Sequence, residues 1–147
     1  MKLSTRGQYG SRLLLDLALH QGKGPVLLRD IACRQQIPLP YLKQLVAPLV
    51  SGGLLRSTRG AKGGLLLAKS PEQVHLREVI QLLEGPIAPV ECVNDPRLCE
   101  RSSSCATRDV WAQLQKAMED VLEGTTLRDL MERQREKEQP GAVMYNI

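Results

Sequence analysis

Three of the four cysteines, Cys92, Cys99 and Cys105, lie within fourteen residues of one another. Thiolate sulfur is a soft ligand that suits iron–sulfur clusters, zinc and copper(I). Zinc sites usually use cysteines two to four residues apart, whereas six and five residues separate these three. The spacing therefore favours an iron–sulfur cluster over zinc, while thiol redox sensing and purely structural cysteines remain alternatives. The fourth cysteine, Cys33, stands apart, and we expect it to be a small buried side chain.

A second group of chemically suggestive residues lies between Ser57 and Gly64. Arg59, Gly60 and Lys62 belong to this glycine-rich stretch, which separates two short apolar runs. Such a pattern predicts a β-hairpin with a cationic tip. Because glycines leave the backbone without bulk, the tip could approach a phosphate backbone or enter a minor groove.

The hairpin follows a pattern typical of a helix-turn-helix. Residues 30–36 favour a short helix, and the proline-containing segment 37–40 ends it. Residues 41–50 then have apolar side chains at helical spacing and are followed by two glycines. We expect three residues to lie off the apolar stripe and to face a DNA major groove: Tyr41, Lys43 and Gln44.

The remaining elements complete a mainly α fold with a small β-wing. Residues 8–20 favour an amphipathic helix, and Thr5 and Arg6 just before it are candidates for contact with DNA. Residues 26–28 favour a short strand that pairs with the wing. The prediction is thus a winged helix-turn-helix plus a long C-terminal dimerisation helix.

We expect five parts along the chain. They are a winged-helix DNA-binding domain (1–70), a connecting helix and linker (71–91), a cysteine cluster loop (92–105), dimerisation helices (106–138) and a disordered tail (139–147). The stretch 86–104 is predicted to be irregular over about twenty residues, which is unusual unless the loop has a function. The helix that begins near residue 107 has few partners in its own domain, so its apolar face favours a symmetric homodimer.

The charges are divided unevenly between the two halves of the chain. Residues 1–70 contain eleven Lys or Arg and two acidic residues, a net charge of +9, whereas residues 71–147 have a net charge of −5. Positive charge that coincides with the helix-turn-helix predicts binding of double-stranded DNA. The alternative is an ordinary helical domain with a solvated basic loop.

Several classes of protein are excluded by the sequence. It contains no apolar run long enough to cross a membrane and no signal-peptide pattern, so we expect a cytoplasmic location. It also lacks a Ser–His–Asp order and a phosphate-binding loop, so we expect no enzymatic activity.

Taken together, these residues resemble the IscR-type iron–sulfur transcriptional regulators of the Rrf-two superfamily. The resemblance covers residues 1 to about 135 and rests on residues 1–10, 16–18, 31–32, 38–45 and 59–64 and on the three-cysteine loop. It implies a dimeric winged-helix regulator of operator DNA that binds a 2Fe–2S or 4Fe–4S cluster. It further implies that Tyr41, Lys43 and Gln44 read bases, that Arg59 enters the minor groove, and that Cys92, Cys99 and Cys105 are the cluster ligands.

The sequence departs from that pattern at two informative places. Arg108 occupies the position of the histidine that is the fourth cluster ligand, and a guanidinium group cannot take this role. The candidates for the fourth ligand are Cys33, His20, Asp109 and an external thiol or water. Lys43 replaces a glutamate of the family, which would favour guanine or phosphate over cytosine and hence a different operator.

The function we expect is therefore DNA binding whose affinity is set by an iron–sulfur cluster, in response to iron, cluster status, or redox or nitrosative stress. The alternative is a regulator of the same fold that lacks a cluster and responds through thiol oxidation or a metabolite.

Overall fold

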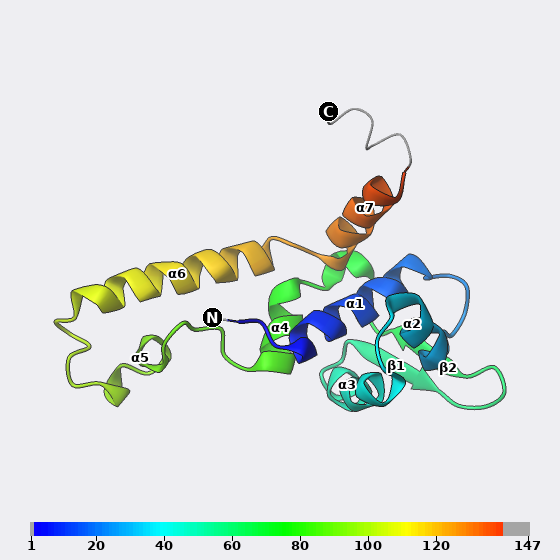
Figure 1. Ribbon diagram of the computed structural model, residues 1–147, viewed down its shortest axis with the longest axis horizontal. Helices are drawn as coiled ribbons and strands as arrows, with labels where there is room; N and C mark the ends of the chain where they lie inside the picture. Colours follow the sequence, from blue (N-terminus) through cyan, green and yellow to red (C-terminus); the bar gives the residue numbers. More distant parts are fainter. Residues whose placement is uncertain (1, 140–147) are drawn as a thin grey trace.

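The computed structural model, which describes residues 2–139, has a helical body from which a long arm extends (Figure 1). The elements are α1 (Thr5–Leu19), α2 (Leu28–Gln35), α3 (Leu39–Ser51), β1 (Leu55–Thr58), β2 (Gly64–Leu67), α4 (Leu76–Glu84), α5 (Glu91–Asn94), α6 (Ala106–Glu123) and α7 (Leu127–Glu138), with 3₁₀ turns at Pro71–Gln73 and Pro96–Leu98. The expected mainly α fold with a small β-wing is confirmed.

One leucine-rich core holds the body together. α1 runs through its centre and contributes Leu13, Leu14 and Leu17, and α3 contributes Leu42, Leu45 and Leu49 on one face. A second anchor is Asp16, which is 1% exposed and accepts two hydrogen bonds from the Arg34 guanidinium, at 2.6 and 3.0 Å. This pair fixes α2 against α1 and raises the pKa of Arg34.

The helix-turn-helix is confirmed, although both of its helices begin two residues earlier than the sequence predicted. α2 begins at Leu28 rather than Asp30, without a side-chain cap. α3 begins at Leu39, because Pro40 falls in the first turn, where a helix needs no N–H donor.

The wing is an antiparallel hairpin in which Leu55 pairs with Leu67 and Thr58 with Gly64. Residues 26–28 were predicted to form a short strand that pairs with the wing, but only Val26 pairs with it. Val26 and Leu65 exchange backbone hydrogen bonds of 2.9 and 2.8 Å, which ties the wing to the body.

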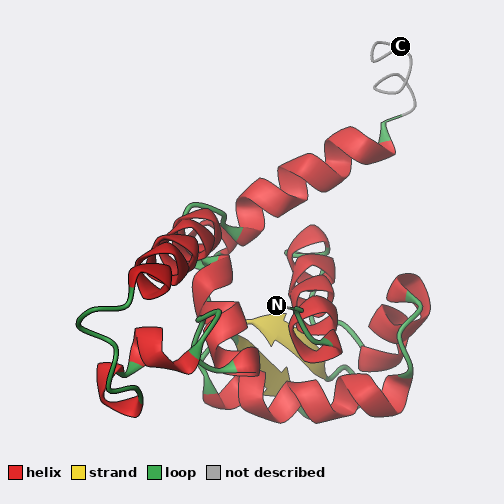
Figure 2. Cartoon of the chain, turned by 60° about the vertical axis from the view of Figure 1, so that its left-hand side comes forward, coloured by secondary structure: helices red, strands yellow, loops and turns green. Residues whose placement is uncertain are grey.

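The arm consists of the segment 85–105 and α6. The segment is not wholly irregular as predicted, because α5 and a 3₁₀ turn interrupt it. None of the eighteen residues of α6 is buried. Figure 2, a view turned by 60° from that of Figure 1, also shows α6 beside the body rather than within it.

α7 returns to the body. Leu127 and Met131 are buried in the same core as α1, and the backbone N–H of Leu127 donates to Val74 at 2.9 Å. α7 thus contributes to the fold of a single chain. The predicted tail lies outside the described residues, except for Gln139. No described helix is long and apolar enough to pass through a lipid bilayer.

Candidate DNA-binding surface and cysteine segment

The outer face of α3 is the first part of the candidate surface. Lys43 and Gln44 are exposed there, as predicted, and Pro40 and Ala47 lie beside them at helical spacing. These neighbours are short or compact, so the backbone of α3 could approach the edges of DNA bases closely.

Tyr41 does not point freely outward as the sequence suggested. It is half-buried, and its ring meets that of Tyr9 edge to face, with centroids 5.4 Å apart. The Tyr41 hydroxyl lies 2.8 Å from the Thr5 hydroxyl, and the Arg12 guanidinium lies 5.6 Å from the centre of the Tyr9 ring. This network joins the starts of α1 and α3. Tyr9 was missed as a candidate because its ring is partly packed into the core.

Arg6 lies beside this network, at the first turn of α1. Its Nε atom donates to the backbone oxygen of Leu83 at 3.1 Å, which anchors the side chain to the end of α4. The residue as a whole remains exposed. Thr5, Arg6 and Tyr41 are thus brought close together by contacts between α1, α3 and α4.

The wing is the second part of the surface. Arg59 and Lys62 are exposed at its tip, and neither forms an ion pair within the described residues. Gly60 has a φ of 104°, a region that favours glycine, and a Cβ atom at Gly63 would collide with the backbone oxygen of Thr58. The conformation of the tip, which exposes Arg59 and Lys62, therefore depends on glycine at positions 60 and 63.

The three clustered cysteines lie on the arm. Cys92 is in α5, Cys99 follows the 3₁₀ turn, and Cys105 directly precedes α6. Their sulfurs suit an iron–sulfur cluster chemically. Among residues 2–139, however, no three His, Cys, Asp or Glu side chains are grouped closely enough to hold a metal ion. The donor set fits a cluster chemically, but in the described part of the chain the three sulfurs are not gathered around one point.

The candidates for a fourth ligand are widely separated. Asp109 is in the first turn of α6, whereas His20 and Cys33 lie in the body, at the end of α1 and in α2 (Figure 1). Cys33 is exposed, so the prediction that it is buried was wrong. The buried face of α2 is formed by Ile31 and Ala32 instead. Arg108 donates from Nε to the backbone oxygen of Cys92 at 3.2 Å and thereby links α5 to α6.

Cys105 has an environment that favours its thiolate. The Thr107 hydroxyl lies 3.2 Å from Sγ and lowers the pKa of the thiol, and a backbone N–H of Arg108 acts in the same direction. A thiol just before a helix N-terminus is further stabilised as an anion by the helix dipole. Cys105 is therefore suited both to metal ligation and to reaction with oxidants.

We expect the alkylation rate of Cys105 to reach half its maximum below about pH 8.5, the pKa of a free cysteine. The measurement uses iodoacetamide and a protein in which the other three cysteines are alanine. Thr107→Val should move the midpoint upward because the hydroxyl donor is lost, whereas Ser103→Ala should not. A midpoint at or above the ordinary value would contradict this account of the thiol.

The exposed face of α3, the cationic wing and the start of α1 define a winged helix-turn-helix protein of the DNA-binding class. The family model for Rrf2, an iron-dependent transcriptional regulator, matches residues 3–133. The chain accordingly belongs to the Rrf2 family of transcriptional regulators.

Several relatives support this assignment. Protein rrf2 of Nitratidesulfovibrio vulgaris is 44% identical over 131 residues, 89% of this chain and 87% of the relative. The solved structure of T. potens IscR has a TM-score of 0.80 at 37% identity and covers 99% of this chain and 96% of its own. CymR, the global cysteine regulator of Bacillus subtilis, has a TM-score of 0.78 at 40% identity, with coverages of 90% and 98%.

These comparisons confirm the predicted superfamily. They also agree with the expectation that the chain is not an enzyme, because the relatives are transcriptional regulators.

Proposed function

We propose that this protein is a homodimeric regulator that binds operator DNA and responds to a signal received by the cysteines of its arm. The observation that supports DNA binding most directly is the wing, where Arg59 and Lys62 are free of ion pairs within the described residues. The base-reading roles of Lys43 and Gln44, the contacts of Thr5 and Arg6, and the cytoplasmic location belong to the same proposal.

The proposal of a homodimer is supported by the apolar face of α6. Val110 is 54% exposed and Val121 is 67% exposed, on a helix that buries no residue in its own chain. Exposed apolar stripes of this kind mark interaction surfaces. A two-fold dimer would also present two recognition helices to two half-sites of an operator.

For the signal, we propose an iron–sulfur cluster held by Cys92, Cys99 and Cys105. Three soft ligands lie on a largely exposed segment, and the Thr107 hydroxyl lowers the pKa of one of them, the Cys105 thiol. When bound, the cluster would supply reversible chemistry that depends on iron and oxidants. Since the described sulfurs are not gathered, loading would have to rearrange residues 92–105, which lead directly into α6.

A second candidate is direct thiol sensing without a cluster. The lowered pKa of Cys105, caused by the Thr107 hydroxyl beside its sulfur, favours it, and the likeness to a cysteine regulator is in keeping with it. Analysis of iron and sulfide after anaerobic reconstitution separates the two candidates, because only the first requires bound iron and sulfide.

We expect Arg59→Ala to weaken binding to an operator selected from random duplexes by about 1–3 kcal/mol, because it removes a cation from the wing. Fluorescence anisotropy across a salt series measures this loss. The matched control is Lys116→Ala on α6, which removes the same charge from an exposed pair with Asp120 and should have little effect. Equal affinities for Arg59→Ala and the unaltered protein would exclude contact between the wing and DNA.

A further inference from the structure

The carboxylate of Glu84, the last residue of α4, lies against the first turn of α1. Its Oε1 atom accepts hydrogen bonds from the backbone N–H groups of Ser4, at 2.9 Å, and Gly7, at 3.1 Å, and from the Ser4 hydroxyl. The first N–H groups of a helix have no partner within the helix, and the helix dipole attracts negative charge there. Glu84 therefore caps α1 from a distant part of the chain.

This position is unfavourable for α4 itself. A negative charge at the C-terminus of a helix opposes the helix dipole, and Glu84 is the last residue of α4. The favourable interactions of this carboxylate are therefore those with the N-terminus of α1 and not those within α4.

The two helices are fitted closely at this contact. A Cβ atom at Gly7 would lie 2.7 Å from Oε1 of Glu84, so a side chain there would displace the carboxylate. Next to it, the Nε atom of Arg6 donates to the backbone oxygen of Leu83 at 3.1 Å. The end of α4 thus holds both the backbone and a side chain of the turn that contains Thr5 and Arg6.

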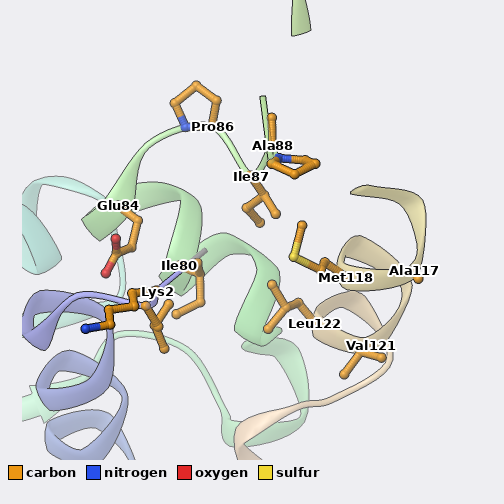
Figure 3. Close-up of a pocket in the computed structure, with 12 residues that line it drawn as sticks. Lys2, Ile80, Glu84, Pro86, Ile87, Ala88, Ala117, Met118, Val121 and Leu122 are labelled. Atoms are coloured by element: carbon orange, nitrogen blue, oxygen red, sulfur yellow. The ribbon is translucent and has the colours of Figure 1, made fainter. Parts of the chain in front are cut away.

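The same carboxylate borders the arm. Glu84, Lys2 and Leu3 line one side of a cavity of about 520 Å³ whose other side is formed by residues 86–89 and α6 (Figure 3). Glu84 directly precedes the segment that contains the clustered cysteines. It therefore lies where the arm meets the proposed DNA-binding surface.

We propose that Glu84 is a positioning residue for DNA binding, which caps α1 and thereby holds Thr5 and Arg6 against the phosphate backbone. This inference rests on the proposed function, because it assumes that the start of α1 contacts DNA.

The test is the affinity of Glu84→Ala for a random-sequence duplex across a salt series. We expect the affinity to fall about 3- to 30-fold, the effect of a lost helix cap. We also expect the salt slope to decrease by about 0.9 if one phosphate contact is lost. Glu84→Gln keeps an acceptor oxygen and should recover most of the affinity and the slope.

The direction of the change in DNA affinity is informative. Removal of a negative charge by itself strengthens binding to a polyanion such as DNA, whereas the proposal predicts weaker binding. The matched control is Glu72→Ala, which makes the same change in charge at an exposed residue without hydrogen bonds or ion pairs in the described part of the chain. Its affinity should be unchanged or slightly higher.

An unchanged or increased DNA affinity of Glu84→Ala would overturn the proposal. A lower affinity with an unchanged salt slope would also overturn it, because that result indicates only a smaller fraction of folded protein. If Glu84→Ala does not fold, Gly7→Ala decides by the same criterion, because its Cβ atom would displace the Glu84 carboxylate: a reduced slope supports the proposal and an unchanged slope overturns it. If the unaltered protein shows no salt-dependent binding, the proposed function fails as well. If only the Glu84 variants deviate from expectation, this inference alone fails.

Discussion

Val121→Asp is expected to convert the protein from a dimer into a monomer and to weaken operator binding about a hundredfold or more, because a monomer engages only one of two half-sites. Val110, Leu114, Ala117 and Val121 recur every three or four residues along α6 and so share one face. Val121 is 67% exposed within its own chain, so an aspartate there should not disturb the fold of a single chain. Between two copies it would bury unpaired charges, which is strongly unfavourable.

Light scattering gives the molar mass, and fluorescence anisotropy gives the affinity. Lys116→Gln is the matched control, since it makes the same change in net charge at an exposed residue of α6 that lies off the apolar face. That variant should remain dimeric. A dimeric Val121→Asp protein with unaltered affinity would show that α6 is not the surface between copies.

Replacement of Cys92, Cys99 and Cys105 together by alanine is expected to abolish the binding of iron and sulfide. After anaerobic reconstitution, the unaltered protein should absorb visible light through sulfide-to-iron charge transfer, and the triple variant should be colourless. The three side chains are exposed or half-buried, so their loss should leave the fold intact.

Cys33→Ala is the control. Although the sequence made Cys33 a candidate for the fourth ligand, it lies in α2 within the body, away from the arm. It should retain the chromophore and the content of iron and sulfide. A triple variant that keeps its colour would show that other residues bind the cluster. An unaltered protein without iron or sulfide, whose DNA affinity nevertheless responds to thiol oxidants, would favour the second candidate.

Local signals were sufficient to predict the body of this protein. Pro38 marks the turn before α3, Pro40 lies in the first turn of that helix, and the glycines between residues 60 and 64 mark the tip of the wing. The start of α3 was placed two residues late because a proline in a first turn resembles one that ends a helix. The burial of Cys33 was predicted wrongly because a small apolar side chain at the edge of a helical stripe suits either environment.

The contacts that organise the candidate surface could not be predicted in the same way, because they join residues far apart in the sequence. The Thr5–Tyr41 hydrogen bond and the contact of Tyr9 with Tyr41 depend on how α1 meets α3. One signal was available for Glu84, since an acidic residue at the end of a helix opposes the helix dipole and so suggests an external partner. In the arm, local polar contacts such as the ion pair of Asp95 with Arg97 shape the chain. Contacts of this kind leave no periodic pattern of apolar residues, so the sequence did not reveal the fold of that segment.

The most direct test of the whole account is the affinity of the protein for its operator before and after anaerobic loading with iron and sulfide. We expect the dissociation constant to change about 5- to 150-fold, which corresponds to a coupling of about 1–3 kcal/mol, and we expect no change in the triple cysteine variant. Equal affinities for loaded and unloaded protein would contradict the claim that a cluster held by the cysteines of the arm controls the DNA affinity of the winged helix.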